Sequence, residues 1–254
     1  MSESRVVLVT GGTRGIGAAV AAAFLAAGDT VVVCARRPPE QRPRHREREA
    51  SFLAADLRDA EGAAALVDAV LERHGRLDVL VNNAGGTASA PAAELLPGRA
   101  AAVVDLNLLA PFYVAQRANR AMQGQLEGGT IVNVGSVAAA RPAPGTAMYA
   151  AAKAGLEALT RALAVEWGPK VRVNLVTPGP VETEGSARHY GGEQGIEAVR
   201  ATIPAGRMAR PEDVARACVL IASPEAGFVS GAELRVDGGG EVPGWLVALR
   251  DRNG

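Results

Sequence analysis

Short apolar runs alternate with longer alanine-rich segments along almost the whole chain, and this alternation limits the folds that the chain can adopt. The apolar runs have the length of strands, whereas the alanine-rich segments have helical periodicity. The run Val31–Val33 is apolar at successive positions, as expected when helices cover both faces of a parallel sheet. We therefore expect a single α/β domain with a doubly wound, seven-stranded parallel sheet flanked by helices. The expected strands are Arg5–Thr10, Thr30–Cys34, Ser51–Ala55, Val79–Val81, Thr130–Val134, Arg172–Val176 and Glu233–Val236.

Length and charge favour one domain that binds a small ligand. A chain of 254 residues can form a single core. Lys plus Arg and Asp plus Glu number 27 each, so no net field would attract nucleic acid or an anionic membrane. The first apolar run begins close to the N-terminus without an export signal, and we expect a cytoplasmic protein. Cys34 and Cys218 lack the spacing of a metal site or a redox pair, so we expect two buried thiols and no metal.

The segment Arg36–Glu49 interrupts the alternation. Three prolines, Pro38, Pro39 and Pro43, fall in a run that is rich in arginine. Proline lacks the N–H group that a helix interior needs, so we expect a loop with at most a short helical turn. At the other end of the chain, residues 241–254 form a tail that contains Trp245, and the placement of this tail stays open.

A glycine-rich loop, residues 10–17, follows the first expected strand and precedes the helical stretch Ala18–Ala27, which ends at a capping glycine, Gly28. Glycines let the backbone approach a pyrophosphate closely, and the positive end of the helix stabilises its charge. We expect a dinucleotide here; a glycine turn without a ligand is the alternative. The expected contacts are Gly11, Thr13, Arg14, Gly15, Ile16 and Gly17.

The end of the second expected strand indicates which dinucleotide is bound. An acidic residue there would bond the ribose 2′-hydroxyl and repel a 2′-phosphate, but the chain has Cys34-Ala35-Arg36-Arg37. Two arginine contacts, from Arg14 and Arg36, would favour NADP(H) over NAD(H) by on the order of 10² to 10⁴. The alternative is that these arginines are solvated loop charges, and for Arg37 the choice stays open.

Two further strand ends are expected to meet the same ligand, because ligands of open α/β sheets bind at the carboxyl ends of strands. Asp56 and Leu57 close the third expected strand, and Asp56 could accept a hydrogen bond from the adenine amino group. Asn83, Ala84 and Gly85 close the fourth. The alternative for both strand ends is a turn that shapes the backbone and binds no ligand.

Three polar residues near the fifth expected strand form a candidate catalytic group. Ser136 follows that strand, and Tyr149 and Lys153 lie four apart on the next helix, so they share one helical face. Tyrosine exchanges protons poorly near neutral pH unless a cation stabilises the phenolate, and Lys153 supplies that cation. Ser136 could bond the substrate oxygen. A Tyr and Lys pair on a helix surface is common by chance, and the hypothesis depends on the whole group.

Asn107 lies in the helical stretch Val103–Arg120, four residues before Pro111. Because Pro111 has no N–H, the Asn107 carbonyl lacks its usual helical partner and could hold a water molecule that links Lys153 to solvent. A proline kink without a relay is the alternative.

Together these residues resemble the short-chain dehydrogenase/reductase family, specifically members with a Thr-Gly-x-x-x-Gly-x-Gly loop and a Tyr-x-x-x-Lys pair. The Arg36–Glu49 segment is shorter and richer in proline than the family's usual helix. The resemblance extends over nearly the whole chain and includes Thr10–Gly17, Asp56, Asn82–Gly85, Asn107, Ser136, Tyr149, Lys153, Pro178-Gly179 with Thr183, Gly206–Asp213 and Val236–Gly239.

This resemblance implies a Rossmann fold and assigns a catalytic tetrad to Asn107, Ser136, Tyr149 and Lys153. It also implies that Tyr149 and Lys153 contact the cofactor, Lys153 at the nicotinamide ribose. Pro178, Gly179, Val181 and Thr183 are implied to meet the nicotinamide end. The family is commonly tetrameric through two long helices, here about residues 98–122 and 148–167, so a homotetramer or homodimer is expected.

The resemblance is strongest to 3-oxoacyl carrier-protein reductases, which implies reduction of a 3-oxoacyl thioester or a related ketone. A free ketone, steroid, sugar or polyketide intermediate stays open. Residues 182–205 are polar, glycine-rich and long enough for a substrate lid, although a passive surface loop is the alternative. The competing hypothesis is a non-catalytic NADP(H)-binding redox sensor or scaffold, which would not need Tyr149 or Lys153.

Overall fold

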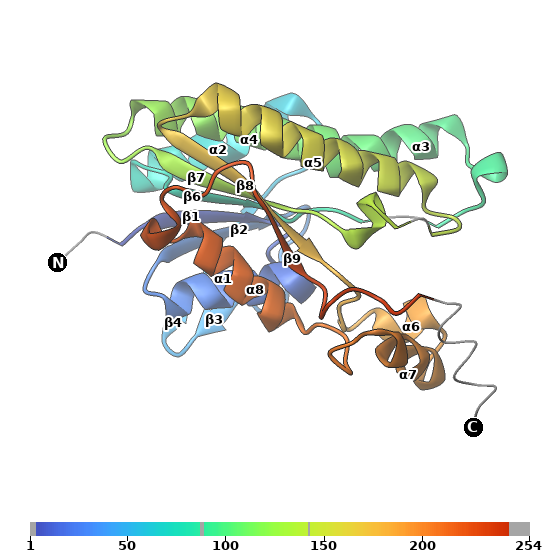
Figure 1. The fold of residues 1–254 in the computed structure, drawn as a ribbon. Helices are drawn as coiled ribbons and strands as arrows, with labels where there is room; N and C mark the ends of the chain where they lie inside the picture. The colour runs from blue at the N-terminus through green and yellow to red at the C-terminus, as the bar shows by residue number, and fades with distance from the viewer. Residues whose placement is uncertain (1–3, 87–88, 142, 244–254) are drawn as a thin grey trace.

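The computed structural model describes residues 4–86, 89–141 and 143–243. Seven parallel strands form one sheet in the order β5-β2-β1-β6-β7-β8-β9, with helices on both faces (Figure 1). The expected doubly wound α/β fold is therefore confirmed. The strands are β1 Val6–Thr10, β2 Thr30–Ala35, β5 Ser51–Ala54, β6 Val79–Asn82, β7 Gly129–Val134, β8 Val171–Pro178 and β9 Glu233–Val236.

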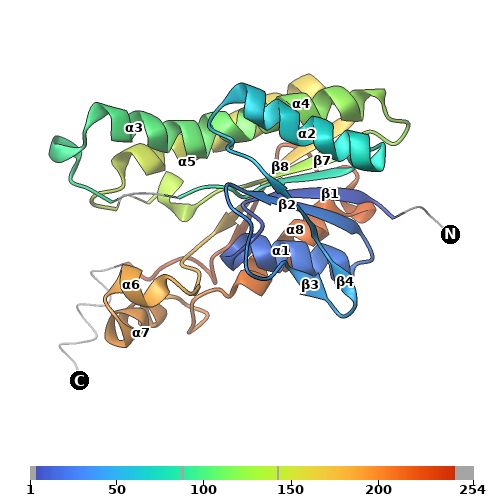
Figure 2. The same cartoon turned by 180° about the vertical axis from the view of Figure 1, so that it is seen from behind.

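Successive residues of the strands enter two different cores, which explains their unbroken apolar runs. In β1, Val6 and Leu8 pack into one core, whereas Val7 and Val9 pack into the other. The first core lies under α2 Ala60–His74, α4 Ala110–Gly124 and α5 Ala147–Trp167. The second lies under α1 Gly15–Ala26 and α8 Pro211–Ala222, on the opposite face of the sheet (Figures 1 and 2). Cys34 and Cys218 are buried in these cores, as expected.

The strand order reverses at β1, which pairs with β2 on one side and β6 on the other. The connections that leave β1 and β6 turn to opposite faces of the sheet. A crevice opens at such a point beside the carboxyl ends of the strands, and it is the usual ligand site of open α/β sheets.

The expected loop at residues 36–49 contains a small hairpin instead of a helical turn. Strands β3 Arg44–His45 and β4 Arg48–Glu49 pair antiparallel, and β3 packs against α1. Arg46 adopts the left-handed conformation with φ 53°, which closes the tight turn between the strands. The N–H of Ala50 also donates to the carbonyl of Pro43 at 2.9 Å, which closes the open end of the hairpin.

The helical stretch around Asn107 has three parts. Helix α3 Pro97–Val104 leads into a π-helical turn, η2 Asp105–Leu109, and α4 follows. The N–H of Ala110 donates to the carbonyl of Asp105, five residues back. Pro111 has no N–H group, and the wider turn lies directly before it, as expected for a proline that interrupts the regular ladder.

Residues 182–205 contain two short helices, α6 Ser186–Tyr190 and α7 Glu193–Thr202, where the composition suggested an irregular loop. Gly191 and Gly192 have φ of 79° and 90° and form the turn between them. Short 3₁₀ turns lie at η1 Ala92–Glu94, η3 Val137–Ala139 and η4 Pro224–Ala226. Within the described ranges, no helix is both long and apolar enough to cross a membrane. Residues 244–254 of the tail, with Trp245, lie outside the described residues.

Candidate active site

The glycine loop after β1 forms a close-packed cradle at the start of α1. Gly11 and Gly15 have φ of 62° and 52°, which favour glycine. A Cβ on Gly17 would lie 2.3 Å from the Gly11 carbonyl oxygen and 2.5 Å from the Asn83 Nδ2. No side chain caps the start of α1, and its first turn has no acidic residue. The free N–H groups and the positive end of the helix therefore suit a bound phosphate.

The loops after β1 and β6 are held together by Thr10. Its hydroxyl oxygen accepts the N–H groups of Asn83 and Ala84, both at 3.0 Å. In return, the Asn83 side chain donates to the carbonyls of Thr10 and Gly11 at 3.0 and 3.2 Å. Two loops that are distant in sequence thus form one wall of the crevice. Thr13 and Ile16 are half-buried beside this wall, and Ile16 also packs on the α1 and α8 core.

Arg14, the residue directly before α1, and Arg36, the residue directly after β2, are both exposed. Asp56 follows β5, and its carboxylate accepts the Arg58 Nε at 2.9 Å. This hydrogen bond, opposed by a smaller effect of burial, lowers the pKa of Asp56, and the charge of Arg36 contributes to the same shift. Asp56 therefore stays ionised as an acceptor, while Leu57 beside it is buried.

A cavity of about 660 Å³ adjoins Asp56. It lies between the end of β5, the helix α2 and the turn η2, and Arg58 and Asp105 contribute polar groups to its lining. Asp56 is the one expected cofactor contact among the residues that line this cavity.

Ser136, Tyr149 and Lys153 converge at the carboxyl end of β7. Ser136 precedes η3, and Tyr149 and Lys153 lie on α5. Lys153 is 4% exposed, and its ammonium donates to the carbonyl of Val134 at 2.8 Å. The same nitrogen lies 5.8 Å from the centre of the Tyr149 ring.

The charge states of these groups follow from burial. Burial raises the pKa of Tyr149, and a hydrogen bond with Ser136 opposes the shift without cancelling it. Burial lowers the pKa of Lys153 to about 8. The expected stabilisation of a Tyr149 phenolate by Lys153 is therefore not found in the chain alone, because desolvation is the larger effect.

Asn107 joins this group through Gly85 and Gly86. The Asn107 side chain is fully buried; it donates to the carbonyl of Gly86 at 2.8 Å and accepts its N–H at 3.1 Å. It also donates to the Val103 carbonyl at 2.8 Å. A Cβ on Gly85 would lie 2.9 Å from the Asn107 Oδ1 and 3.5 Å from the Lys153 Nζ. A side chain at position 85 would therefore crowd both Asn107 and Lys153.

The segment after β8 reaches across the crevice from the opposite side. Pro178 ends β8, and the N–H of Gly179 donates to the Val236 carbonyl at 3.0 Å. Val181 forms an isolated bridge with Ala209. A Cβ on Gly15 would lie 3.7 Å from the Thr183 methyl group, so Thr183 stands over the start of α1.

We did not predict several residues of the site from the sequence. Arg58 orients Asp56 and follows it by two positions, a spacing that could have suggested a pair. Arg141 binds Asp237 at 2.9 Å and Glu241 at 3.0 Å, which joins the segment after η3 to the segment after β9. Ser186 bonds to Thr183 and Val181. Arg141 and Ser186 belong to no local motif and depend on the fold.

Comparison with known proteins agrees with this fold and site. A family model described as enoyl-(acyl carrier protein) reductase matches residues 11–241. A solved short-chain dehydrogenase/reductase from Serratia marcescens superposes with a TM-score of 0.83 at 30% identity, covering 93% of this chain and 98% of that one. The chain belongs to the short-chain dehydrogenase/reductase family, whose members are oxidoreductases that generally bind NAD(H) or NADP(H).

Two curated relatives show how varied the family's substrates are. D-threitol dehydrogenase of Mycolicibacterium smegmatis is 37% identical, with 93% of both chains covered. The 3alpha-hydroxysteroid dehydrogenase of Mediterraneibacter gnavus is 36% identical, with 94% of this chain and 97% of the relative covered. One name specifies a small polyol and the other a steroid.

Proposed function

We propose that the chain is an NADP(H)-dependent oxidoreductase that interconverts a ketone and a secondary alcohol, with Tyr149 as general acid and base. The observation that carries this proposal is the convergence of Ser136, Tyr149 and Lys153 beside Gly85, at the carboxyl ends of β6 and β7. Bound NADPH would supply the hydride.

Each residue of this group has a role that follows from its environment. The raised pKa keeps Tyr149 a neutral phenol near pH 7, as a proton donor to a developing alkoxide must be. The Ser136 hydroxyl, bonded to that phenol, is placed to donate to the same oxygen. Lys153, held at Val134, would bond the nicotinamide ribose and replace the proton that Tyr149 gives up. Water bound by the Asn107 carbonyl would connect Lys153 to solvent.

The residues present fit a dinucleotide with a 2′-phosphate. Among the described residues, only the Thr183 methyl group lies within 4 Å of a Cβ added to Gly15, so the bare backbone at the start of α1 adjoins space that suits a pyrophosphate. Arg14 and Arg36 are exposed at the expected position of the adenosine ribose, and the end of β2 has no carboxylate. The contacts assigned to NADP(H) are Gly11, Thr13, Arg14, Gly15, Ile16, Gly17, Arg36, Asp56, Leu57, Asn83, Ala84, Gly85, Tyr149, Lys153, Pro178, Gly179, Val181 and Thr183.

For the substrate we propose a 3-oxoacyl thioester or a related ketone, bound under a lid formed by residues 182–205. Helices α6 and α7 support this assignment, since they project from the body of the domain beside the end of β8 (Figure 1). The relatives' names favour a secondary alcohol or ketone and leave its size open.

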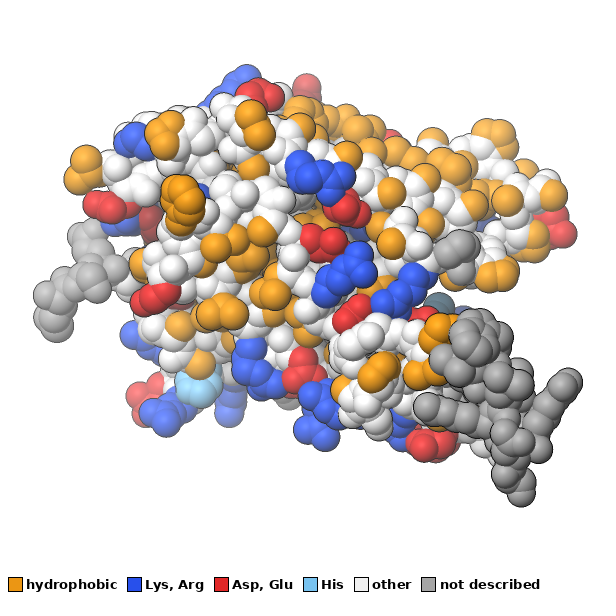
Figure 3. All heavy atoms as spheres, in the orientation of Figure 1, with side chains coloured by type: hydrophobic (Ala, Val, Ile, Leu, Met, Phe, Trp, Pro, Cys, Tyr) orange, Lys and Arg blue, Asp and Glu red, His pale blue; other side chains and the backbone are white. Residues whose placement is uncertain are grey.

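We also propose a homotetramer or homodimer formed through α4 and α5. Hydrophobic side chains are exposed along the helical layer at the top of Figure 3, and Val165 of α5 is 86% exposed. The two free thiols suit a reducing compartment, so we propose a cytoplasmic location.

The test is a panel of ketones that includes 3-oxoacyl thioesters, incubated with NADPH and NADH in parallel and followed at the nicotinamide absorbance. We expect NADPH oxidation with at least one ketone. Tyr149→Phe should lower kcat by about 10² to 10⁴ while NADPH still binds. A Tyr149→Phe variant with full activity would refute the mechanism, and an inert panel with bound NADPH would favour the redox sensor.

A further inference from the structure

The side chain of Ser186 closes a tight turn at the start of the proposed lid. Ser186 is 3% exposed, and its hydroxyl oxygen accepts the N–H of Thr183 at 2.8 Å. The same hydroxyl donates to the carbonyl of Val181 at 3.2 Å. The backbone N–H of Ser186 also donates to the Thr183 carbonyl at 3.0 Å. Ser186 and Thr183 therefore hold each other through two hydrogen bonds that run in opposite directions.

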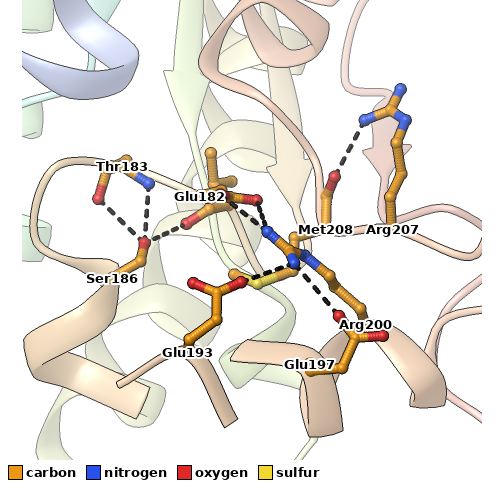
Figure 4. Close-up of polar contacts among 9 residues, drawn as sticks. Glu182, Thr183, Ser186, Glu193, Glu197, Arg200, Arg207 and Met208 are labelled. Atoms are coloured by element: carbon orange, nitrogen blue, oxygen red, sulfur yellow. Dashed lines mark hydrogen bonds and ion pairs between the residues drawn. The ribbon is translucent and has the colours of Figure 1, made fainter. Parts of the chain in front are cut away.

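A second attachment acts on Glu182, the residue between Val181 and Thr183. Arg200 of α7 donates to both carboxylate oxygens of Glu182 at 3.0 Å (Figure 4). Glu193 and Glu197 bind the other arm of the same guanidinium at 3.0 and 3.2 Å. A single nitrogen, Nη2, makes both contacts to Glu182, while Nη1 contacts Glu193 and Glu197, so the guanidinium is held among three carboxylates. The ion pair between Arg200 and Glu182 therefore connects helix α7 directly to residues 181–183 beside the crevice.

The backbone of the same segment is anchored to the body of the protein. The N–H of Glu182 donates to the Ala209 carbonyl at 2.8 Å, and the N–H of Ala209 donates to the Pro180 carbonyl at 2.9 Å. These bonds secure positions 180 to 182 and end before Thr183. The Thr183 N–H depends on the Ser186 hydroxyl, and the Thr183 methyl group faces Gly15 at the start of α1.

We infer that Ser186 and Arg200 are positioning residues that hold Val181–Thr183 in the conformation that receives the nicotinamide half of the dinucleotide. The inference rests on the proposed function for the identity of that ligand. Without the Ser186 hydroxyl, Thr183 must be ordered when the ligand binds, which weakens binding. The adenosine half is assigned mainly to Arg36 and Asp56, which follow β2 and β5, on the other side of β1 from β8, so its binding should depend less on this turn.

The experiment compares a whole dinucleotide with its adenosine fragment on the full-length protein. Calorimetry would measure the Kd of NADPH and of 2′,5′-ADP, with NADH and 5′-AMP in parallel so that cofactor choice does not affect the outcome. For Ser186→Ala and for Arg200→Gln we expect about tenfold weaker dinucleotide binding, because the ligand must then order a segment that is preformed in the wild type. Binding of the fragment should stay within twofold of the wild type. Ser186→Thr keeps the hydroxyl and should restore most of the dinucleotide affinity.

Ser230→Ala is the matched control. The Ser230 hydroxyl also accepts a backbone N–H, that of Val173 at 3.2 Å, but at the opposite end of β8. It should bind both ligands as the wild type does. The inference is wrong if Ser186→Ala and Arg200→Gln bind the dinucleotide normally, or if they lose dinucleotide and fragment affinity equally. If the wild type binds neither dinucleotide, the proposed function itself fails.

Discussion

The buried ammonium of Lys153 donates to the carbonyl oxygen of Val134 at 2.8 Å, which fixes a cation at the carboxyl end of β7. Burial lowers its pKa from 10.5 to about 8 in the folded chain. Below pH 8 the lysine is protonated in both the folded and the unfolded chain. The free-energy cost of burying its charge then destabilises the folded state in full. Between pH 8 and 10.5 the folded state loses its proton first, so this cost is relieved as the pH rises.

We therefore predict a pH-dependent difference between the wild type and Lys153→Met. From pH 7 to pH 10, the unfolding free energy of the wild type relative to the variant should rise by about 2 to 3 kcal/mol. Urea unfolding at the two pH values measures it. Lys170→Met, which removes the chain's other lysine at an exposed position, controls for the loss of a lysine. A constant difference would show that Lys153 is not desolvated in solution.

The choice of cofactor should depend on Arg14 and Arg36. The double variant Arg14→Ala with Arg36→Asp removes two guanidinium groups and adds a carboxylate at the end of β2. The ratio of kcat/KM for NADPH to that for NADH should fall by on the order of 10² or more, because a carboxylate repels a 2′-phosphate. Steady-state kinetics with both cofactors measures this ratio. An unchanged ratio would mean that the two arginines are solvated charges.

Gly17 should tolerate no side chain. In Gly17→Ala the new methyl group would meet the Gly11 carbonyl and the Asn83 side chain, so either the loop or α1 must shift. We expect a loss of about 1 to 3 kcal/mol in stability and a loss of dinucleotide binding. Thermal unfolding and calorimetry measure the two effects. Gly98→Ala in α3 is the control, since no atom of the described residues lies within 4 Å of its added Cβ and the change should leave stability equal or higher.

Pro111 should support the proton path through the Asn107 carbonyl. Pro111→Ala adds an N–H that can donate to that carbonyl and tighten the π-helical turn before it. If water at this carbonyl resupplies protons, kcat should fall and the solvent isotope effect on kcat should rise. The bond from the Asn82 side chain to the Pro111 carbonyl at 3.1 Å uses backbone atoms and persists in the variant. An unchanged rate and isotope effect would contradict the relay.

The seven strands could be predicted because local composition decides them. Val31–Val33 and the other runs are buried at successive positions, as expected for parallel strands that helices cover on both faces. The hairpin at residues 44–49 was missed, because its pairing involves two residues on each side and a left-handed Arg46. Helices α6 and α7 were missed for a similar reason, since their glycines suggested a loop and their positions depend on the Arg200 ion pairs.

The sequence by itself determined which residues can reach the site, since the strand ends at Thr10, Asn83 and Ser136 follow from the order of strands in a parallel sheet. The tertiary structure alone decided how these residues engage. The Asn107 side chain bonds to Gly86, 21 positions away, and Lys153 bonds to Val134, 19 positions away. Such contacts depend on how η2 packs against α5 and on how α4 and α5 pack against the sheet, α4 at β6 and β7 and α5 at β8. The charge states of Tyr149 and Lys153 also depend on that packing, because desolvation is a property of the folded core.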